Sequence, residues 1–213
     1  MYAFVERPAS VPDVLGIDDA AVEVEPADEV DVVVSRHEAL PREASEAAIM
    51  AHARVVEALA AANEGVLPAR FGGAHNDVTA LRAAVGGREE ALRTALARVR
   101  GCVELGVRVL APSGERAAAS SGSAYMQARL EQRRESERLA EELHAPLAAR
   151  AREATRTVGA TQRLLLSAAY LVPKDEVGAF TASVETLQAE HRDLGIVCTG
   201  PWPPYSFATA EAT

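Results

Sequence analysis

The chain has 213 residues, 48% of them hydrophobic and only 4% aromatic, so a core of small and branched side chains can fill one large domain or two small ones. The formal net charge is −9, which argues against binding to nucleic acid or to an anionic membrane, because both need a basic surface. No run of about 18 apolar residues occurs, and we therefore expect no membrane-spanning helix.

Three strands are predicted near the N-terminus. Tyr2–Glu6 is the first, and the absence of a basic stretch there argues against a signal peptide. Ala20–Glu25 alternates apolar and acidic residues and should end at Pro26. Val30–Val34 is almost continuously apolar, as expected for a strand buried on both faces. The last two can pair as a hairpin.

A helix should open at Leu40-Pro41-Arg42-Glu43 and end near Gly65, a candidate left-handed cap. Its apolar stripe contains Ile49, His52, Val56 and Leu59, widened by Ala48 and Val55. His52 therefore lies on an apolar face. It is interpreted as a structural histidine with one hydrogen bond, and the alternative is a ligand or a proton switch.

The region after this helix should contain a strand, two helices and a second strand. The strand from Val66 leads into the turn Arg70-Phe71-Gly72-Gly73, which lacks the Lys-Ser/Thr of a P-loop. Asn76 or Asp77 should cap the first helix, and Gly101 should end the second. Cys102–Leu110 alternates cleanly, with Glu104 and Arg108 on one face and valines and Leu105 on the other.

A small, polar stretch at 112–123 marks the predicted domain boundary. We predict an α+β protein with an N-terminal domain at 1–111, a Ser/Gly-rich linker or mobile loop at 112–123, and a C-terminal domain at 124–213. Both domains should be small α/β-sandwich-like units.

The second half should read helix, two strands, helix, strand. The first helix spans roughly Ala124–Arg152, and Pro146 should kink or shorten it. Glu131 with Arg134, and Glu135 with Arg138, are predicted i,i+3 pairs. A hairpin then turns at Gly159-Ala160, followed by a helix from Val177 to His191, capped by Gly195, and a strand at Ile196–Thr199.

The C-terminal motif Gly200-Pro201-Trp202-Pro203-Pro204-Tyr205-Ser206-Phe207 is stiff, because each proline fixes its own φ and restricts the residue before it. Its aromatic side chains are predicted to clamp onto the core, and the alternative is a recognition edge for a partner. Trp202-Pro203 is a candidate cis peptide.

Catalytic and metal-binding signatures are missing from the sequence. The five histidines do not occur at i,i+3 or i,i+4, and no nucleophile motif is present. Cys102 and Cys198 lie far apart in apolar contexts and are predicted to be free thiols, with a disulfide as the alternative. We expect no enzyme activity, no cofactor and no metal.

Four stretches, in order, resemble the gas vesicle accessory proteins of the L/F family (GvpL/GvpF). The resemblance runs from Tyr2 to Phe207, and its most specific part is the C-terminal motif. The stretches are Val66–Gly72 after the His52 helix, Cys102–Val109, Ala168–Val172 and Thr199–Phe207.

The resemblance implies two α+β domains, the C-terminal one like a modified ferredoxin fold. It also implies a cytoplasmic, non-enzymatic factor in gas vesicle assembly, or a minor structural component. Such a factor would act as a chaperone-like binder of the small hydrophobic shell protein and of other accessory proteins. A ligand-binding sensory module on a ferredoxin-like scaffold, using the Arg70–Gly73 turn, is the alternative function.

Six residues of the Arg70–Gly73 turn and the C-terminal motif are candidate partner-binding or motif residues, and three further residues are predicted to be structural. The candidates are Arg70, Phe71, Trp202, Pro203, Pro204 and Tyr205. The structural residues are His52, Glu104 and Tyr170.

Overall fold

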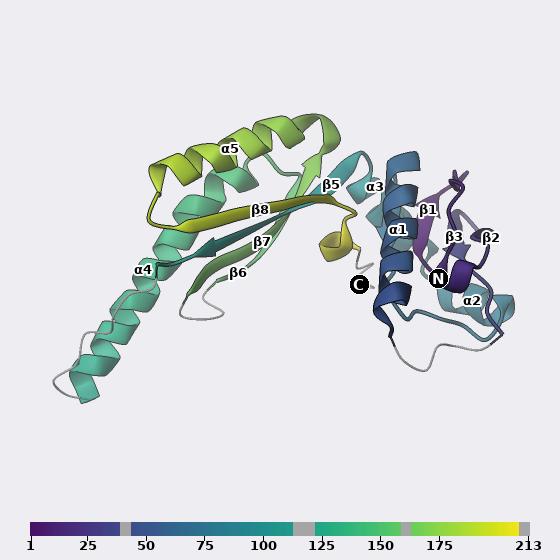
Figure 1. The fold of residues 1–213 in the computed structure, drawn as a ribbon, viewed down its shortest axis with the longest axis horizontal. Helices are drawn as coiled ribbons and strands as arrows, with labels where there is room; N and C mark the ends of the chain where they lie inside the picture. Colours follow the sequence, from purple (N-terminus) through teal and green to yellow (C-terminus); the bar gives the residue numbers. More distant parts are fainter. Residues whose placement is uncertain (39–43, 113–121, 159–162, 209–213) are drawn as a thin grey trace. The chain divides into compact units, whose positions relative to one another are not determined.

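The computed structural model describes residues 1–38, 44–112, 122–158 and 163–208. They form an α+β fold with two four-stranded sheets (Figure 1). Two compact units result, a first unit of Met1–Val103 with the residues from Trp202 onward, and a second unit of Glu104–Pro201. The predicted linker at 112–123 stays a prediction, because residues 113–121 lie outside the described ranges.

The first unit contains the sheet β2-β3-β1-β4. Its strands are β1 (Ala3–Glu6), β2 (Glu23–Ala27), β3 (Val30–Val34) and β4 (Val66–Pro68). Strand β1 pairs antiparallel with both β3 and β4, and all of β3 is buried, as its apolar run predicts. The predicted hairpin joins β2 and β3. The first strand of this hairpin was expected at Ala20–Glu25 with its end at Pro26, whereas β2 starts at Glu23 and continues through Pro26. An edge strand tolerates proline where the missing N–H would not pair with a neighbouring strand.

Three α-helices complete this unit, and α1 (Glu46–Ala62) differs from its prediction at both ends. Ser45 caps its first turn by accepting from the Ala48 amide, whereas the expected opening at 40–43 lies outside the described residues. It ends at Asn63 in an extended conformation, so Gly65 is not a left-handed cap. Ile49 was expected in the apolar stripe but is 44% exposed. The buried face of α1 is instead centred on Ala48, His52, Val55 and Leu59.

The remaining helices of the first unit follow the sequence pattern. Asp77 accepts from the Ala80 amide and caps α2 (Val78–Val85). Helix α3 (Glu89–Val99) buries Leu92, Leu96 and Val99, and Gly101 follows it with a φ of +68° that suits glycine. A short turn of helix, η1 (Ile17–Asp19), packs against α1.

The second unit has the element order β-α-β-β-α-β and the sheet order β6-β7-β5-β8. This is the arrangement of a ferredoxin-like fold, as predicted. Its main elements are β5 (Cys102–Leu110), α4 (Gly122–Ala148), β6 (Glu153–Val158), β7 (Leu164–Pro173), α5 (Val177–Glu190) and β8 (Gly195–Trp202). Strand β5 precedes the proposed linker yet belongs to this sheet, a long-range pairing that local patterning does not reveal.

The core of the second unit lies between one face of its sheet and the helices α4 and α5. Strand β5 contributes Leu105, Val107 and Val109 to this core, and the sheet's other face carries Glu104 and Arg108. That alternation follows the predicted pattern. The helices lie together on one side of the sheet in Figure 1.

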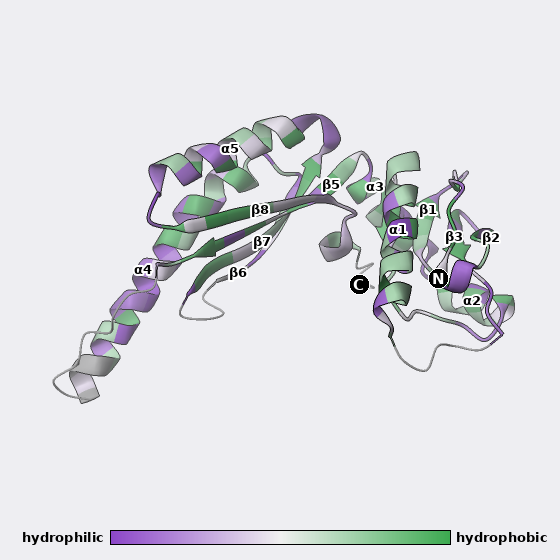
Figure 2. Cartoon of the chain, viewed as in Figure 1, coloured by the Kyte–Doolittle hydropathy of each residue, from purple (hydrophilic) through white to green (hydrophobic). Residues whose placement is uncertain are grey.

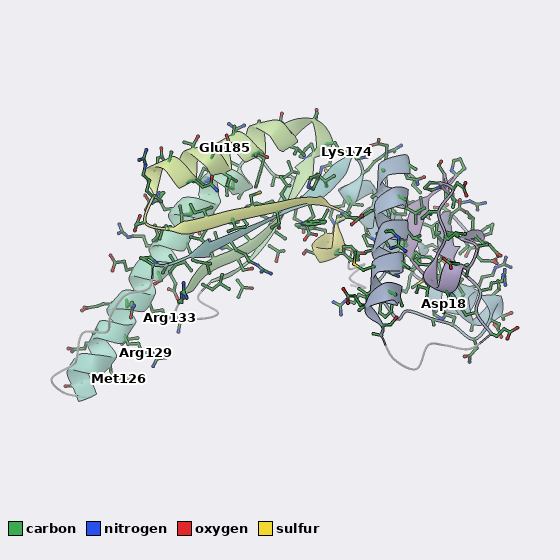
Figure 3. All side chains as sticks on the ribbon, viewed as in Figure 1. Asp18, Met126, Arg129, Arg133, Lys174 and Glu185 are labelled. Atoms are coloured by element: carbon green, nitrogen blue, oxygen red, sulfur yellow. The ribbon has the colours of Figure 1, made fainter. Side chains whose placement is uncertain are left out.

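Helix α4 extends well beyond the sheet (Figure 1). Its first half is solvent-exposed, with Met126 57% exposed and Arg129 and Arg133 projecting from the same stretch in Figure 3. Arg133 Nε lies 2.8 Å from Glu137 Oε1, an i,i+4 pair in place of the predicted i,i+3 pairs. Pro146 lies inside the helix, which ends two residues later at Ala148.

The structure tests several smaller expectations. Helix α5 ends at His191, and Gly195 begins β8 instead of capping the helix. Gly200-Pro201 is cis, whereas Trp202-Pro203 is not. Both cysteines are free thiols, as predicted. Among the described residues, no helix combines the length and the hydrophobicity needed to span a bilayer.

Candidate functional site

The C-terminal segment of the first unit carries the strongest candidate surface. After β8 the chain runs through Pro203 and Pro204 into a turn of 3-10 helix, η3 (Tyr205–Phe207). Trp202 is 47% exposed and Tyr205 is 41% exposed, while Phe207 is only 2% exposed and both prolines are buried. The predicted aromatic clamp is therefore wrong for Trp202 and Tyr205 and right for Phe207.

Local hydrogen bonds and the fixed proline geometry explain this division. The Tyr205 amide donates to the Pro203 carbonyl at 2.8 Å, and the Phe207 amide donates to the Pro204 carbonyl at 3.1 Å. Arg98 of α3 donates through Nη2 to the Phe207 carbonyl at 2.6 Å. The segment is thus held by its prolines, its backbone and Phe207, and the Trp202 and Tyr205 side chains are left facing solvent.

Tyr205 lies near helix α1. Partial burial and the Glu57 carboxylate both raise the pKa of its hydroxyl, so the phenol stays neutral at physiological pH. Element η3 also packs beside the edge strand β4. The Tyr205 ring is therefore carried by a turn that packs against regular secondary structure of the first unit.

The Arg70–Gly73 turn lies at the end of β4. Gly72 has a φ of +87°, and the Gly73 amide donates to the Arg70 carbonyl at 3.3 Å. The Gly73 carbonyl accepts from the N-terminal amine of Met1 at 3.1 Å. Arg70 is exposed. The Gly73 amide is therefore engaged within the turn and is not available to an anion.

Phe71 belongs to a small aromatic cluster with His52 and Tyr2. The His52 ring lies 5.6 Å from Phe71 in an edge-on arrangement and 5.2 Å from Tyr2. His52 is 4% exposed, and its Nε2 lies 3.0 Å from the Ala69 carbonyl. Burial lowers its pKa, so the ring is neutral at physiological pH and Nε2–H donates to that carbonyl. This environment fits a structural histidine.

The other two residues expected to be structural lie in the second unit. Tyr170 on β7 is fully buried, and its hydroxyl lies 2.8 Å from His144 Nδ1. Its ring centroid lies 5.1 Å from that of Phe180 on α5. Glu104 is half-buried on the sheet face that α4 and α5 do not cover. Both residues belong to the second unit, whereas the segment from Trp202 onward belongs to the first.

The side chains of this surface are of the kind that is enriched in protein interfaces. Within the described ranges, no three His, Cys, Asp or Glu side chains come together as a metal site would require. The distinguishing feature is a pair of large, exposed aromatic rings on a rigid backbone. Sequence reasoning located this segment but assigned its rings to the core. The signal that it missed is the adjacent pair of buried prolines, which can anchor the segment without help from the two rings flanking them.

Known proteins resemble this chain over most of its length. The family model for gas vesicle synthesis protein GvpL/GvpF matches residues 1–209. Gas vesicle protein F2 of Halobacterium salinarum is 34% identical over 177 residues, which cover 82% of this chain and 74% of that protein. Gas vesicle protein F1 of the same organism is 31% identical over 67% of this chain and 59% of its own length.

Solved structures show the same fold. The crystal structure of the gas vesicle protein GvpF from an Anabaena species superposes with a TM-score of 0.78 at 20% identity, covering 98% of this chain and 94% of that one. GvpF from Microcystis aeruginosa superposes with a TM-score of 0.74 at 21% identity, covering 98% and 97%. Together with the match of the family model, these likenesses show that the chain belongs to the GvpL/GvpF family of gas vesicle synthesis proteins.

Proposed function

We propose that this chain is an assembly factor or minor structural component of gas vesicles that binds the small hydrophobic shell protein and other accessory proteins. It acts in the cytoplasm and at the growing vesicle, without a cofactor and without catalysing a reaction. Family membership supports the accessory role. The observation that carries the binding proposal is the exposure of Trp202 and Tyr205 on a fixed backbone.

The physical basis is preorganised apolar contact. Tryptophan and tyrosine contribute most of the binding energy at many protein interfaces, because each buries a large area at a small cost in side-chain entropy. The buried prolines and Phe207 already fix the backbone between and after the two rings. Binding therefore costs little further conformational entropy in this segment.

A shell subunit with exposed apolar surface would tend to aggregate before assembly. Covering part of that surface with the two rings would lower the concentration of the aggregation-prone form. The net charge of −9 would help to keep the resulting complex in solution. Release would follow when contacts between shell subunits replace those with this chain.

The decisive test uses a gas vesicle gene cluster in which this chain is replaced by variants. Trp202→Ala and Tyr205→Ala, singly and together, remove the rings. Leu15→Ala is the matched control, because Leu15 is also exposed, at 54%, and lies in the same unit. Co-purification of the shell protein with the tagged chain, and the yield of buoyant vesicles, are the readouts.

We expect the double variant to fold with an almost unchanged melting temperature and to retain less than a tenth of the shell protein that the unaltered chain captures. The Leu15→Ala chain should capture as much as the unaltered one. Full capture by the double variant would show that the rings are not the contact. Normal vesicle yield without any copy of the chain would remove the essential assembly role.

A further inference from the structure

Helix α1 has an apolar surface on the side that faces away from the core of the first unit. Met50 is 52% exposed and Ile49 is 44% exposed. The 17 residues of the helix include only four polar side chains, those of Glu46, His52, Arg54 and Glu57. Figure 2 shows α1 mostly in the green of hydrophobic residues, whereas the exposed half of α4 is mostly purple. An outer helix face with so few charges indicates a contact surface.

The exposed positions of α1 recur at the spacing of a helix–helix contact. Ala47, Met50, Arg54, Glu57 and Ala61 are all exposed, and they follow one another at intervals of three, four, three and four residues. Positions with these alternating intervals face a second helix in a coiled coil. The five residues, named here the α1 seam, therefore lie along one face and can contact the same partner helix.

The α1 seam contains two charged side chains, Arg54 and Glu57. Oppositely charged residues three positions apart on a helix can pair with each other, as Glu90 and Arg93 do in α3. Within the part of the chain that the structure describes, neither Arg54 nor Glu57 forms an ion pair. Both charges are therefore available to groups of opposite sign on another chain.

The α1 seam is complementary to a second copy of itself when the two helices lie antiparallel. A two-fold axis that crosses the helix between positions 55 and 56 places Arg54 opposite the second copy's Glu57, and Glu57 opposite its Arg54. The same symmetry places the large Met50 side chain opposite the small Ala61, so that a knob meets a hole on each side of the axis. A parallel pair would instead bring like charges together, which is unfavourable.

We propose that two copies of this chain associate through antiparallel α1 helices, with two Arg54–Glu57 ion pairs beside the two-fold axis and Met50 packed on Ala61 at both ends of the contact. One pair of helices of this length buries less than the roughly 1,600 Å² of a standard protein interface. We therefore expect a weak dimer that dissociates on dilution, with a Kd on the order of 10–100 µM.

The α1 contact lies beside one of the two exposed aromatic residues of the C-terminal segment. The Glu57 carboxylate contributes to the raised pKa of the Tyr205 hydroxyl, so the two groups are near each other. The dimer would therefore carry the aromatic surface twice, which increases the avidity for a partner with repeated binding surfaces. The association itself requires no shell protein, and the inference does not rest on the proposed function.

Sedimentation equilibrium of the purified full chain, without any shell protein, measures the dimerisation constant. Arg54→Glu makes both charges of the α1 seam negative, and Glu57→Arg makes both positive. Combining the two substitutions in one chain restores opposite charges across the axis, and so does mixing the two singly altered chains. The melting temperature of each variant establishes that it is folded.

The apolar part of the contact is tested by Met50→Glu. Its matched control is Met126→Glu, because Met126 is also exposed, at 57%, but lies on α4 in the second unit. Both variants add the same charge to an exposed methionine position. A difference between them therefore reports on the place of the charge and not on the change in net charge.

We expect each single charge variant to weaken dimerisation at least tenfold, and the double variant and the mixture to dimerise within threefold of the unaltered chain. Met50→Glu should weaken dimerisation at least tenfold, and Met126→Glu less than twofold. An unaltered chain that stays monomeric at about 1 mM would overturn the proposal. A double variant that fails to regain the dimer would overturn it as well. A dimer that is lost when Trp202 and Tyr205 are both replaced by alanine, but kept in Met50→Glu, would assign the contact to the aromatic surface and overturn the pairing of α1.

Discussion

The Tyr170 hydroxyl lies 2.8 Å from His144 Nδ1 and so links β7 to α4 inside the second unit. Burial raises the pKa of Tyr170, which keeps the hydroxyl protonated, and it therefore donates to a neutral His144. Burial, followed by the nearby Arg156 guanidinium, lowers the pKa of His144 from its ordinary value of 6.5. The Glu141 carboxylate opposes that shift, and Arg156 and Glu141 are themselves an ion pair.

This pair predicts a stability that depends on pH. Because the pKa of His144 is lower in the folded state, the unfolded chain binds the proton first as the pH falls. The stabilisation is complete above pH 6.5 and is lost as the pH falls from there through the folded-state pKa. Urea unfolding at pH 7.5 and pH 5.5 should show lower stability at pH 5.5, and His144→Gln should reduce the difference. A pH difference in stability that is unchanged in the His144→Gln variant would contradict the role of His144. The pH difference that remains in that variant is expected to come from His52, whose pKa is also lowered.

The two outer aromatics and Phe207 should respond oppositely to truncation. Trp202→Ala removes a half-exposed ring and should cost at most about 1 kcal/mol of unfolding free energy. Phe207→Ala removes a ring that is 2% exposed and should cost about 3–5 kcal/mol. Denaturant unfolding of both variants measures this directly. A larger loss for Trp202→Ala than for Phe207→Ala would refute the assignment of the anchor.

Gly16 is predicted to resist substitution. A Cβ there would lie 2.2 Å from the Tyr2 hydroxyl, which accepts from the Ile17 amide at 2.9 Å and bonds Ser35 Oγ at 2.8 Å. Gly16→Ala should therefore cost about 1–3 kcal/mol by displacing a buried ring. The control is Gly178→Ala in α5, where a Cβ meets nothing within 4 Å. That change should stabilise the chain by about 0.5–1 kcal/mol. Equal melting temperatures for the two variants would contradict the steric argument.

His52 should prove structural in a stability measurement. His52→Ala removes a buried ring and leaves the Ala69 carbonyl without its donor, and about 2–4 kcal/mol should be lost. His52→Gln retains an N–H donor and should lose less than half as much. If the alanine variant kept full stability and lost only the ability to bind shell protein, a functional role for the histidine would replace the structural one.

The sequence determined much of this fold through local physical chemistry. Side-chain direction repeats with period 2 in a strand and 3.6 in a helix, so a periodic apolar pattern predicts which face of an element is buried. This held for the valine run of β3, the alternation of β5 and the apolar spacing of α3. Prolines fixed the path of the C-terminal segment. The family resemblance implied a ferredoxin-like second unit, and the predicted order of helix, two strands, helix and strand agreed with it; the sheet order confirms that fold.

In segments without a helical or strand periodicity, only the tertiary structure decided which side chains face solvent. In the turn from Trp202 to Phe207 the choice depends on α1, α3 and β4, which lie at least 100 residues away in the chain. The pairing of β5 with β8 is likewise long-range and leaves β8 as an edge. Whether a side chain is buried depends on the residues that surround it in the fold. When those residues are distant in sequence, the local sequence shows no periodic pattern that reveals the burial. For that reason the sequence located the C-terminal segment, and only the fold showed that Trp202 and Tyr205 are exposed there.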